Sequence, residues 1–242
     1  VLSALALAAV GCSRAGDPEQ EISSGECDKA CLEDVAAEYR AAYLAHDPSL
    51  APFAENVRYT ENNIEMPFPD GTWDTVTEDV GPALVMSDPE WGQVAIFTPV
   101  KQREIEGYLG ARLKVEGGRI TEVEHIISTR RNLSTPPTPI APIAEYELDP
   151  LLDEVVPEQK RATRDELAAH AHGYFDTLQL NDGTLFTEFT EDCDRIENGL
   201  QTTNVEIEGY PIAKMGTADQ FRLGQYVYDD RLRDRRFPLV DE

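Results

Sequence analysis

Residues 108–128 read YLGARLKVEGGRITEVEHIIS, and they carry the clearest fold signal in the chain. Apolar and polar residues alternate on both sides of Gly117-Gly118, and a glycine pair readily supplies the positive φ angles of a two-residue hairpin turn. We therefore expect two antiparallel strands, Tyr108–Glu116 and Ile120–Ser128, joined at this turn. Another strand-like stretch, Gln93–Thr98, precedes them.

The turn also predicts which side chains share a face of the sheet. With the glycines at its centre, Leu113 is expected opposite Glu122, and Ala111 opposite Glu124. The apolar face then carries Leu109, Ala111, Leu113, Val115, Ile120, Glu122, Glu124 and Ile126. The polar face carries Arg112, Lys114, Arg119 and His125.

Two carboxylates on an apolar, inward face are candidates for acid–base chemistry. Burial raises the pKa of a carboxyl group towards neutrality, which suits a general acid or base. Glu124 is the first candidate and Glu122 the second. The alternative is that both lie at the rim, in water or paired with an arginine. A register error of one residue would turn them outwards and make His125 the natural base.

A weak internal repeat suggests two related units. Residues 39–63 align without gaps with residues 175–199, so that Glu61-Asn62-Asn63 meets Glu197-Asn198-Gly199. Each copy begins with an amphipathic helical pattern, and Thr163-Arg164-Asp165-Glu166 is a capping box before the second. We expect a first unit at 27–133, a Pro-rich and acidic linker at 134–162, and an incomplete second unit at 163–242.

Several residues in and near the repeat are candidates for ligand binding. Glu61, Glu197 and Asn198 would present a carboxylate and an amide in each unit, and Tyr59 and Trp73 would line a pocket. The alternatives are that the asparagines form turns and that the aromatic side chains are core.

The first 26 residues predict export. Residues 1–11 are small and apolar, like the remnant of a signal peptide, and residues 9–12 resemble a bacterial lipobox in which Cys12 is lipidated. Residues 12–26 have the composition of a tether. We expect a lipid-anchored protein of the bacterial cell envelope, and the alternative is an ordinary secreted protein. Cys27 and Cys31 favour a local disulfide over a metal site.

Charge and missing motifs exclude several functions. The net charge of −25, from 46 acidic against 21 basic residues, argues against nucleic-acid binding. No internal run approaches the ~20 apolar residues that span a bilayer. No nucleotide-binding glycine loop, serine elbow or zinc-protease motif is present, so no metal or cofactor is expected.

The chain resembles a known family in a set of short motifs. They are Cys27–Leu32, Ala45–Pro48, Tyr59–Asn62, Asp70–Trp73, Asp88–Gln93, Ala111–Val115, Ile120–Glu124, Asp192–Gly199 and Arg233–Glu242. Together they are similar to uncharacterised secreted fungal and bacterial proteins with tandem nuclear-transport-factor-2-like, or SnoaL-like, cone domains.

The resemblance implies an α+β fold, in which a helix packs on a curved antiparallel sheet in each unit, with two units acting as a pseudo-dimer. It implies no settled activity, because the wider superfamily holds dehydratases, isomerases, cyclases, hydrolases and non-catalytic binders. We expect a lyase, isomerase or hydrolase without a cofactor, acting on a small organic molecule. The alternatives are a small-ligand-binding lipoprotein and a structural tandem module.

Overall fold

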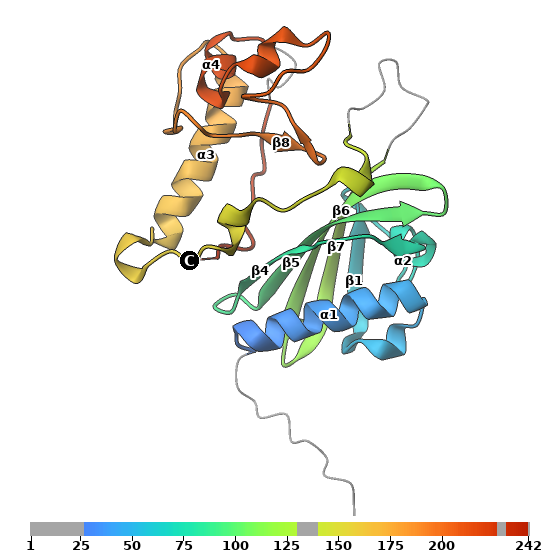
Figure 1. The fold of residues 1–242 in the computed structure, drawn as a ribbon. Coiled ribbons are helices and arrows are strands. Elements are labelled where there is room, and N and C mark those ends of the chain that lie inside the picture. The colour runs from blue at the N-terminus through green and yellow to red at the C-terminus, as the bar shows by residue number, and fades with distance from the viewer. Residues whose placement is uncertain (1–26, 130–139, 227–230, 242) are drawn as a thin grey trace, which may run out of the picture.

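The computed structural model describes residues 27–129, 140–226 and 231–241. A helix and a curved sheet, residues 29–129, form its first part, and a second part of helices, 3-10 turns, one short hairpin and long irregular stretches follows (Figure 1). The predicted signal-peptide remnant, Cys12 and the tether lie outside the described residues, as do residues 130–139 around the Pro-rich start of the predicted linker.

Helix α1 (Lys29–Ala45) opens the first part. The Asp28 side chain caps it by accepting the Cys31 N–H, and His46 ends it in the left-handed conformation, at φ 53°. A disulfide bond joins Cys27 to Cys31 across the first turn. Apolar residues three and four positions apart give the helix one buried face, made of Leu32, Val35, Ala36, Tyr39, Ala42 and Tyr43.

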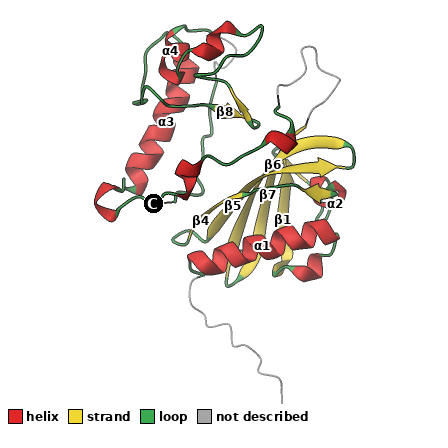
Figure 2. Cartoon of the chain, viewed as in Figure 1, coloured by secondary structure: helices red, strands yellow, loops and turns green. Residues whose placement is uncertain are grey.

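Seven strands form the sheet against which α1 packs. They are β1 (Phe53–Glu61), β2 (Ile64–Glu65), β3 (Glu78–Asp79), β4 (Leu84–Asp88), β5 (Gln93–Gln102), β6 (Ile105–Glu116) and β7 (Arg119–Thr129). The order is β2-β1-β7-β6-β5-β3, with β4 also paired to β5, and only β1 and β7 run parallel. One helix across a curved mixed sheet agrees with the α+β cone expected for this part (Figure 2).

The hairpin β6–β7 has the predicted turn and a different register. Gly117 and Gly118 join the strands at φ 56° and 72°. The pairing then shifts by one residue after Val115 and Ile120, and Thr121 is the extra residue on β7. Such a bulge bends the strand locally and changes the partner of every later residue.

The shifted register exchanges the two faces of β7. Glu124 pairs with Arg112 and His125 pairs with Ala111. Because side chains alternate along a strand, a shift of one residue turns each of them to the other face. The predictions that Glu122 and Glu124 point into the cone and that His125 points away from it are therefore wrong.

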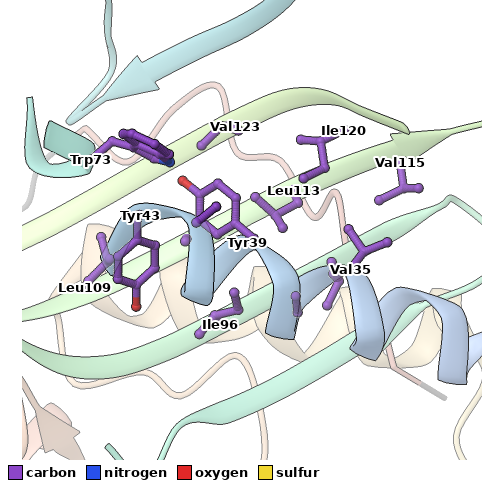
Figure 3. Packing of buried hydrophobic residues seen from close by; sticks show 14 of the residues in the cluster. Val35, Tyr39, Tyr43, Trp73, Ile96, Leu109, Leu113, Val115, Ile120 and Val123 are labelled. Carbon is purple, nitrogen blue, oxygen red and sulfur yellow. The ribbon is translucent and has the colours of Figure 1, made fainter. Parts of the chain in front are cut away.

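The interior of the cone is filled by side chains from both layers. Figure 3 shows Tyr39 and Tyr43 of α1 between the helix and the strands, with Leu109 and Leu113 beside them. Trp73 of the short helix α2 (Thr72–Thr75) covers one end. All five side chains are no more than 1% exposed, so the cone is a packed core in this conformation.

Aromatic residues also cover part of the opposite face of the sheet. Phe97 of β5 and Tyr108 of β6 stack with ring centroids 5.8 Å apart, and Tyr146 packs on both. The 3-10 turn η2 (Ile143–Glu145) directly precedes Tyr146, and the turns η3 (Pro150–Asp153) and η4 (Glu158–Lys160) follow it in the chain. A further 3-10 turn, η1 (Pro48–Leu50), lies between α1 and β1.

Helix α3 (Arg164–Leu180) begins the second part. The predicted capping box is present: Thr163 caps the Glu166 N–H, and the Glu166 carboxylate accepts from the Thr163 N–H. No helix in the described ranges, α1 and α3 included, is long and apolar enough to cross a membrane.

A second cone is not formed by residues 163–226 and 231–241. Their strands are β8 (Ile196–Glu197) and β9 (Leu200–Gln201), followed by the 3-10 turn η5 (Pro211–Lys214) and helix α4 (Thr217–Arg222). The described part of the second unit therefore does not show the expected tandem cone, and the pseudo-dimer built from two cones is not supported.

Asp88 joins the two parts of the molecule. Its carboxylate, 1% exposed, accepts hydrogen bonds from Arg164 of α3 at 2.8 and 2.9 Å and from the Val240 N–H at 2.9 Å. Burial alone would raise the pKa of Asp88, but these donors lower it below its usual value. The second part is thus fixed to the end of β4 by a buried ionised group.

Candidate functional site

A chain of polar side chains crosses the packed interior of the cone. The Tyr39 hydroxyl lies 2.6 Å from His125 Nε2, and the Tyr59 hydroxyl lies 3.1 Å from His125 Nδ1. Tyr59 in turn donates to Glu61 Oε2 at 3.0 Å, and this oxygen also accepts the Thr72 N–H at 2.7 Å. Helix α1, strands β1 and β7 and helix α2 therefore meet in one network.

The network defines the protonation state of the imidazole. The single hydroxyl proton of Tyr59 goes to Glu61, so the Tyr59 oxygen can only accept from His125, and Nδ1 carries the proton. Nε2 is then the acceptor for Tyr39. Complete burial lowers the pKa of His125 to about 3, because no water stabilises the charged ring. His125 is a neutral bridge between two phenols.

Aromatic rings enclose the Glu61 end of this network. Phe68 packs on Phe53, Tyr59 and Trp73, with ring centroids 4.6 to 5.9 Å apart. The indole N–H of Trp73 is buried and has no hydrogen-bond partner among the described residues. Buried donors are rarely left unpaired, so this one is available to an acceptor that enters the cone.

A hollow of about 600 Å³ adjoins the same end of the cone. Phe53, Tyr59, Met66 and Phe68 contribute to its lining. Glu61 lies close by and is 17% exposed, whereas His125 is fully buried. The hollow therefore lies against the rings that close the network off from solvent.

The sequence-predicted ligand residues fall into two groups. Tyr59, Glu61 and Trp73 come together around Phe68, as described above. Glu197 and Asn198 lie in the β8–β9 hairpin on the other side of the sheet, where the Asn198 carbonyl accepts the Ala141 N–H at 3.0 Å.

The repeated Glu-Asn motif is a hairpin turn in both copies. Asn62-Asn63 joins β1 to β2 and Asn198-Gly199 joins β8 to β9, all at positive φ between 47° and 75°. Two consecutive positive φ angles are the requirement of the two-residue turn that asparagine and glycine favour. The asparagines thus have the turn role that was their alternative interpretation.

The two predicted acid–base carboxylates form an ion-pair cluster outside the cone. Arg112 donates to Glu124 at 2.8 Å and to Glu122 at 2.9 Å, and Arg236 of the C-terminal segment donates to the other Glu124 oxygen. Burial would raise the pKa of Glu124, but the hydrogen bonds of the two guanidinium groups lower it below the usual value. The physical basis for Glu124 as a neutral-pH acid or base is therefore absent.

A second buried carboxylate, Asp79, was missed by the sequence reasoning. It accepts hydrogen bonds from Arg40 at 2.8 Å, from Thr98 at 2.6 Å and from Tyr43. Burial would raise the pKa of Asp79, and these donors together lower it. A 1% exposed carboxylate with this set of donors stabilises the fold and has little capacity left for a substrate.

Tyr39, Thr72 and Phe68 were also not predicted as site residues. Tyr39 lies on the apolar face of α1, where a buried hydroxyl needs a hydrogen-bond partner, and this was the available signal. For the other two the sequence holds no signal, because their positions depend on the path of the loop before α2. Among the described residues no three acidic, histidine or cysteine side chains gather as metal ligands.

A family model matches the second part of the chain and does not include the cone. Residues 160–242 match the family model described as "Domain of unknown function (DUF8021)". This range contains α3, the β8–β9 hairpin and α4 and leaves the cone outside it. Among curated proteins, none matches the chain.

Solved structures include three that resemble parts of the chain. "AclR a putative hydroxylase" from Streptomyces galilaeus is 16% identical, with 43% of this chain and 82% of that one covered, at a TM-score of 0.34. A "putative ketosteroid isomerase" from Kribbella flavida is 16% identical. The match covers 57% of this chain and 100% of that one, with a TM-score of 0.34. A de novo designed protein with a curved β-sheet is 14% identical. The match covers 42% of this chain and 88% of that one, with a TM-score of 0.33.

Such low scores carry no information about a ligand or a reaction. The class of the first part follows from its own architecture. Residues 29–129 form one helix packed on a curved, mixed sheet, which agrees with the α+β cone that the sequence predicts for this part.

Proposed function

We propose that this protein binds a small organic molecule at the Glu61 end of the cone and transfers a proton on it without a cofactor. The observation that supports this most is the hydrogen-bonded chain from Tyr39 through His125 and Tyr59 to Glu61. Buried polar networks are costly unless every member is satisfied, and here the chain ends on a partly exposed carboxylate.

The geometry gives each residue a distinct role in this proposal. Glu61 is the proton acceptor, because it is the ionisable end of the chain and is partly exposed to solvent. Burial raises the pKa of Tyr59, so its hydroxyl stays protonated, and on ligand binding this proton would turn from Glu61 to a substrate oxygen. With its pKa near 3, His125 cannot store a proton at neutral pH, and it positions the Tyr59 hydroxyl.

A ligand reaches these groups only if Phe68 moves. In the closed conformation Phe68 packs against Tyr59 and Trp73. A ligand that enters from the adjoining hollow would take the place of this ring. It would accept a hydrogen bond from the Trp73 N–H, which has no partner among the described residues. Exclusion of water by the remaining aromatic rings would strengthen each hydrogen bond to it.

The test is exchange of a carbon-bound proton with solvent deuterium, followed by NMR over a set of small ketones, hydroxy acids and epoxides. Wild-type protein should accelerate exchange on at least one of them. Glu61→Gln and Tyr59→Phe should each reduce the rate by about 100-fold, the usual range for a positioned acid or base. Tyr146→Phe, a tyrosine of the opposite face, is the control. Rates that do not differ between wild type and Glu61→Gln would reject the proposed role.

Binding without catalysis is the second candidate function. It is favoured by the buried Trp73 N–H, which has no partner among the described residues and can donate to a bound ligand without any proton transfer. In that case a compound of the same set would shift the NMR signals of Tyr59 and Trp73, and no exchange would follow.

The proposed address is the outside of the cell membrane. The Cys27–Cys31 disulfide supports an oxidising compartment, since such bonds are rare in the cytosol. Lipidation of Cys12 would hold the folded part at a membrane surface, and the alternative is secretion. Membrane fractionation of wild type and Cys12→Ser distinguishes the two, because only loss of the anchor moves the protein into the soluble fraction.

A further inference from the structure

A groove of about 540 Å³ lies on the sheet face turned away from α1. The C-terminal segment Arg236–Leu239 forms one wall, and residues of β4 to β7 form the floor and the other wall. Most lining side chains are apolar, and they include Met86, Phe97, Ile126, Phe237 and Leu239. Its size and composition are those of small-molecule sites.

The floor of this groove is open because side chains are small there. Ala95 and Gly110 lie in adjacent strands on this face. A Cβ atom added to Gly110 would have its nearest neighbours, both in Ile126, at 3.8 and 4.0 Å, which is ordinary contact. The glycine is thus not required by backbone strain. Beside it, Ile126 leaves 47% of its surface exposed on the sheet.

Charges at the polar end of the groove cancel one another. Arg112 pairs with Glu122 and Glu124, and Arg236 pairs with Glu124. A charged ligand would have to break one of these pairs or remain unpaired in a partly buried place, and either is costly. An uncharged ligand keeps the pairs intact. Arg236, 60% exposed, can offer a guanidinium N–H to an oxygen of such a ligand.

We propose that this groove binds an uncharged, largely apolar small molecule with one hydrogen-bond-accepting oxygen. Its apolar body lies over Gly110 and Ile126, and its oxygen accepts from Arg236. This site is separated from the Glu61 end of the cone by the sheet, so it stands or falls independently of the proposed proton transfer.

The test uses Nile red, an uncharged apolar dye with a carbonyl oxygen, and the full chain. Saturable binding should be weakened at least about tenfold in Gly110→Leu, which fills the floor of the groove. Ala95→Leu fills it from the neighbouring strand and serves if the first variant does not fold. Lys114→Leu, an apolar substitution on the same strand and face but outside the groove, should bind within about twofold of wild type.

Two further measurements make the site and the ligand class falsifiable. In methyl NMR, Nile red should shift Met86 and Ile126 and leave Leu113 and Val123 of the core unchanged. The anionic dye anilinonaphthalene sulfonate should bind at least about tenfold more weakly. Equal binding by both Leu variants and wild type, or shifts confined to the core methyls, would overturn the site. Equal affinity for the anionic dye would overturn its preference for uncharged ligands.

Discussion

The Tyr39 hydroxyl on α1 lies 2.6 Å from Nε2 of His125 on β7. This contact ties the helix to the one strand whose register is shifted by the bulge at Thr121. Without the shift His125 would face the opposite side of the sheet and Tyr39 would lose its buried partner. The bulge is therefore the feature that creates the polar network of the cone.

The buried imidazole should make the protein sensitive to mild acid. The pKa of His125 is about 3 in the folded state and ~6.5 in the unfolded state. Between these two values the unfolded state is mostly protonated and the folded state is not, so acid favours unfolding. Stability is then complete above pH 6.5 and falls as the pH approaches 3. Between pH 7 and pH 4.5 His125 alone should cost about 2 to 3 kcal/mol. Urea unfolding at pH 7 and at pH 4.5 measures this loss of stability.

Histidine variants separate this effect from general acid sensitivity. His125→Gln should be less stable at pH 7, because the ring that packs between Tyr39 and Tyr59 and bonds to both is lost, but should lose most of the difference between the two pH values. His170→Gln changes an exposed histidine bonded to Thr187 and should keep the wild-type difference. An unchanged pH dependence in His125→Gln would show that the ring is protonated or exposed in the folded state.

Asp79 should be the carboxylate on which stability depends most. Its pKa is lowered in the folded state, so its contribution is present above the unfolded value of ~3.9 and is lost as the pH falls through the folded value. Asp79→Asn should cost about 3 kcal/mol at pH 7, since Arg40 loses its charged partner. Asp34→Asn, at an exposed position of α1, should stay within about 0.5 kcal/mol. Equal denaturant midpoints for Asp79→Asn and Asp34→Asn would contradict the special role of Asp79.

Local sequence signals predicted the elements better than their faces. The glycine pair at 117–118, the capping box at Thr163 and the asparagine turns each depend on a few adjacent residues, and each has its expected geometry. The face of Glu124 depends on one extra residue, Thr121, whose type does not distinguish a bulge from a regular strand. Because of this one extra residue, Glu124 lies outside the cone in an ion pair and does not serve as the predicted base.

The second half shows the limit of an argument from repeats. Both copies do contain a 17-residue helix and a turn at Glu-Asn, as the alignment suggests. A cone also needs long paired strands after that turn, and these come from non-local contacts that short identities do not encode. Tyr59 and Trp73 were identified from residue type and Glu61 from the repeated Glu-Asn motif, whereas Phe68 was placed beside them by the loop.

Gly92, in the turn between β4 and β5, and Gly110, in β6, should respond oppositely to substitution by alanine. Gly92 has φ 60°, and a Cβ there would lie 2.5 Å from the Val115 carbonyl oxygen, so Gly92→Ala should cost about 2 kcal/mol or more. Gly110→Ala meets only ordinary contacts, and the loss of glycine flexibility should stabilise the protein by about 0.5 kcal/mol. Denaturant unfolding of the pair tests this. Destabilisation by Gly110→Ala equal to that by Gly92→Ala would show that the groove floor is closed.

The disulfide should contribute modestly to stability. A bond between Cys27 and Cys31 closes a very short loop, for which the chain-entropy estimate is about 2 kcal/mol. The double variant Cys27→Ser, Cys31→Ser should unfold at a slightly lower temperature, and wild type with reductant should match it. Alkylation without reduction should leave both cysteines unmodified in protein from the native compartment. Labelling of both would place the protein in a reducing environment.

The Glu124 carboxyl group should titrate below the ordinary ~4.3 of a free glutamate. The reason is its position between Arg112 and Arg236, whose hydrogen bonds outweigh the effect of burial. Carboxyl-carbon NMR of the full chain measures it directly. Arg236→Ala removes one donor and should raise the pKa, while Arg58→Ala, which removes an exposed partner of Glu65, should leave it unchanged. A Glu124 pKa well above 4.3 in wild type would restore this residue as a candidate acid or base and contradict the shifted register of β7.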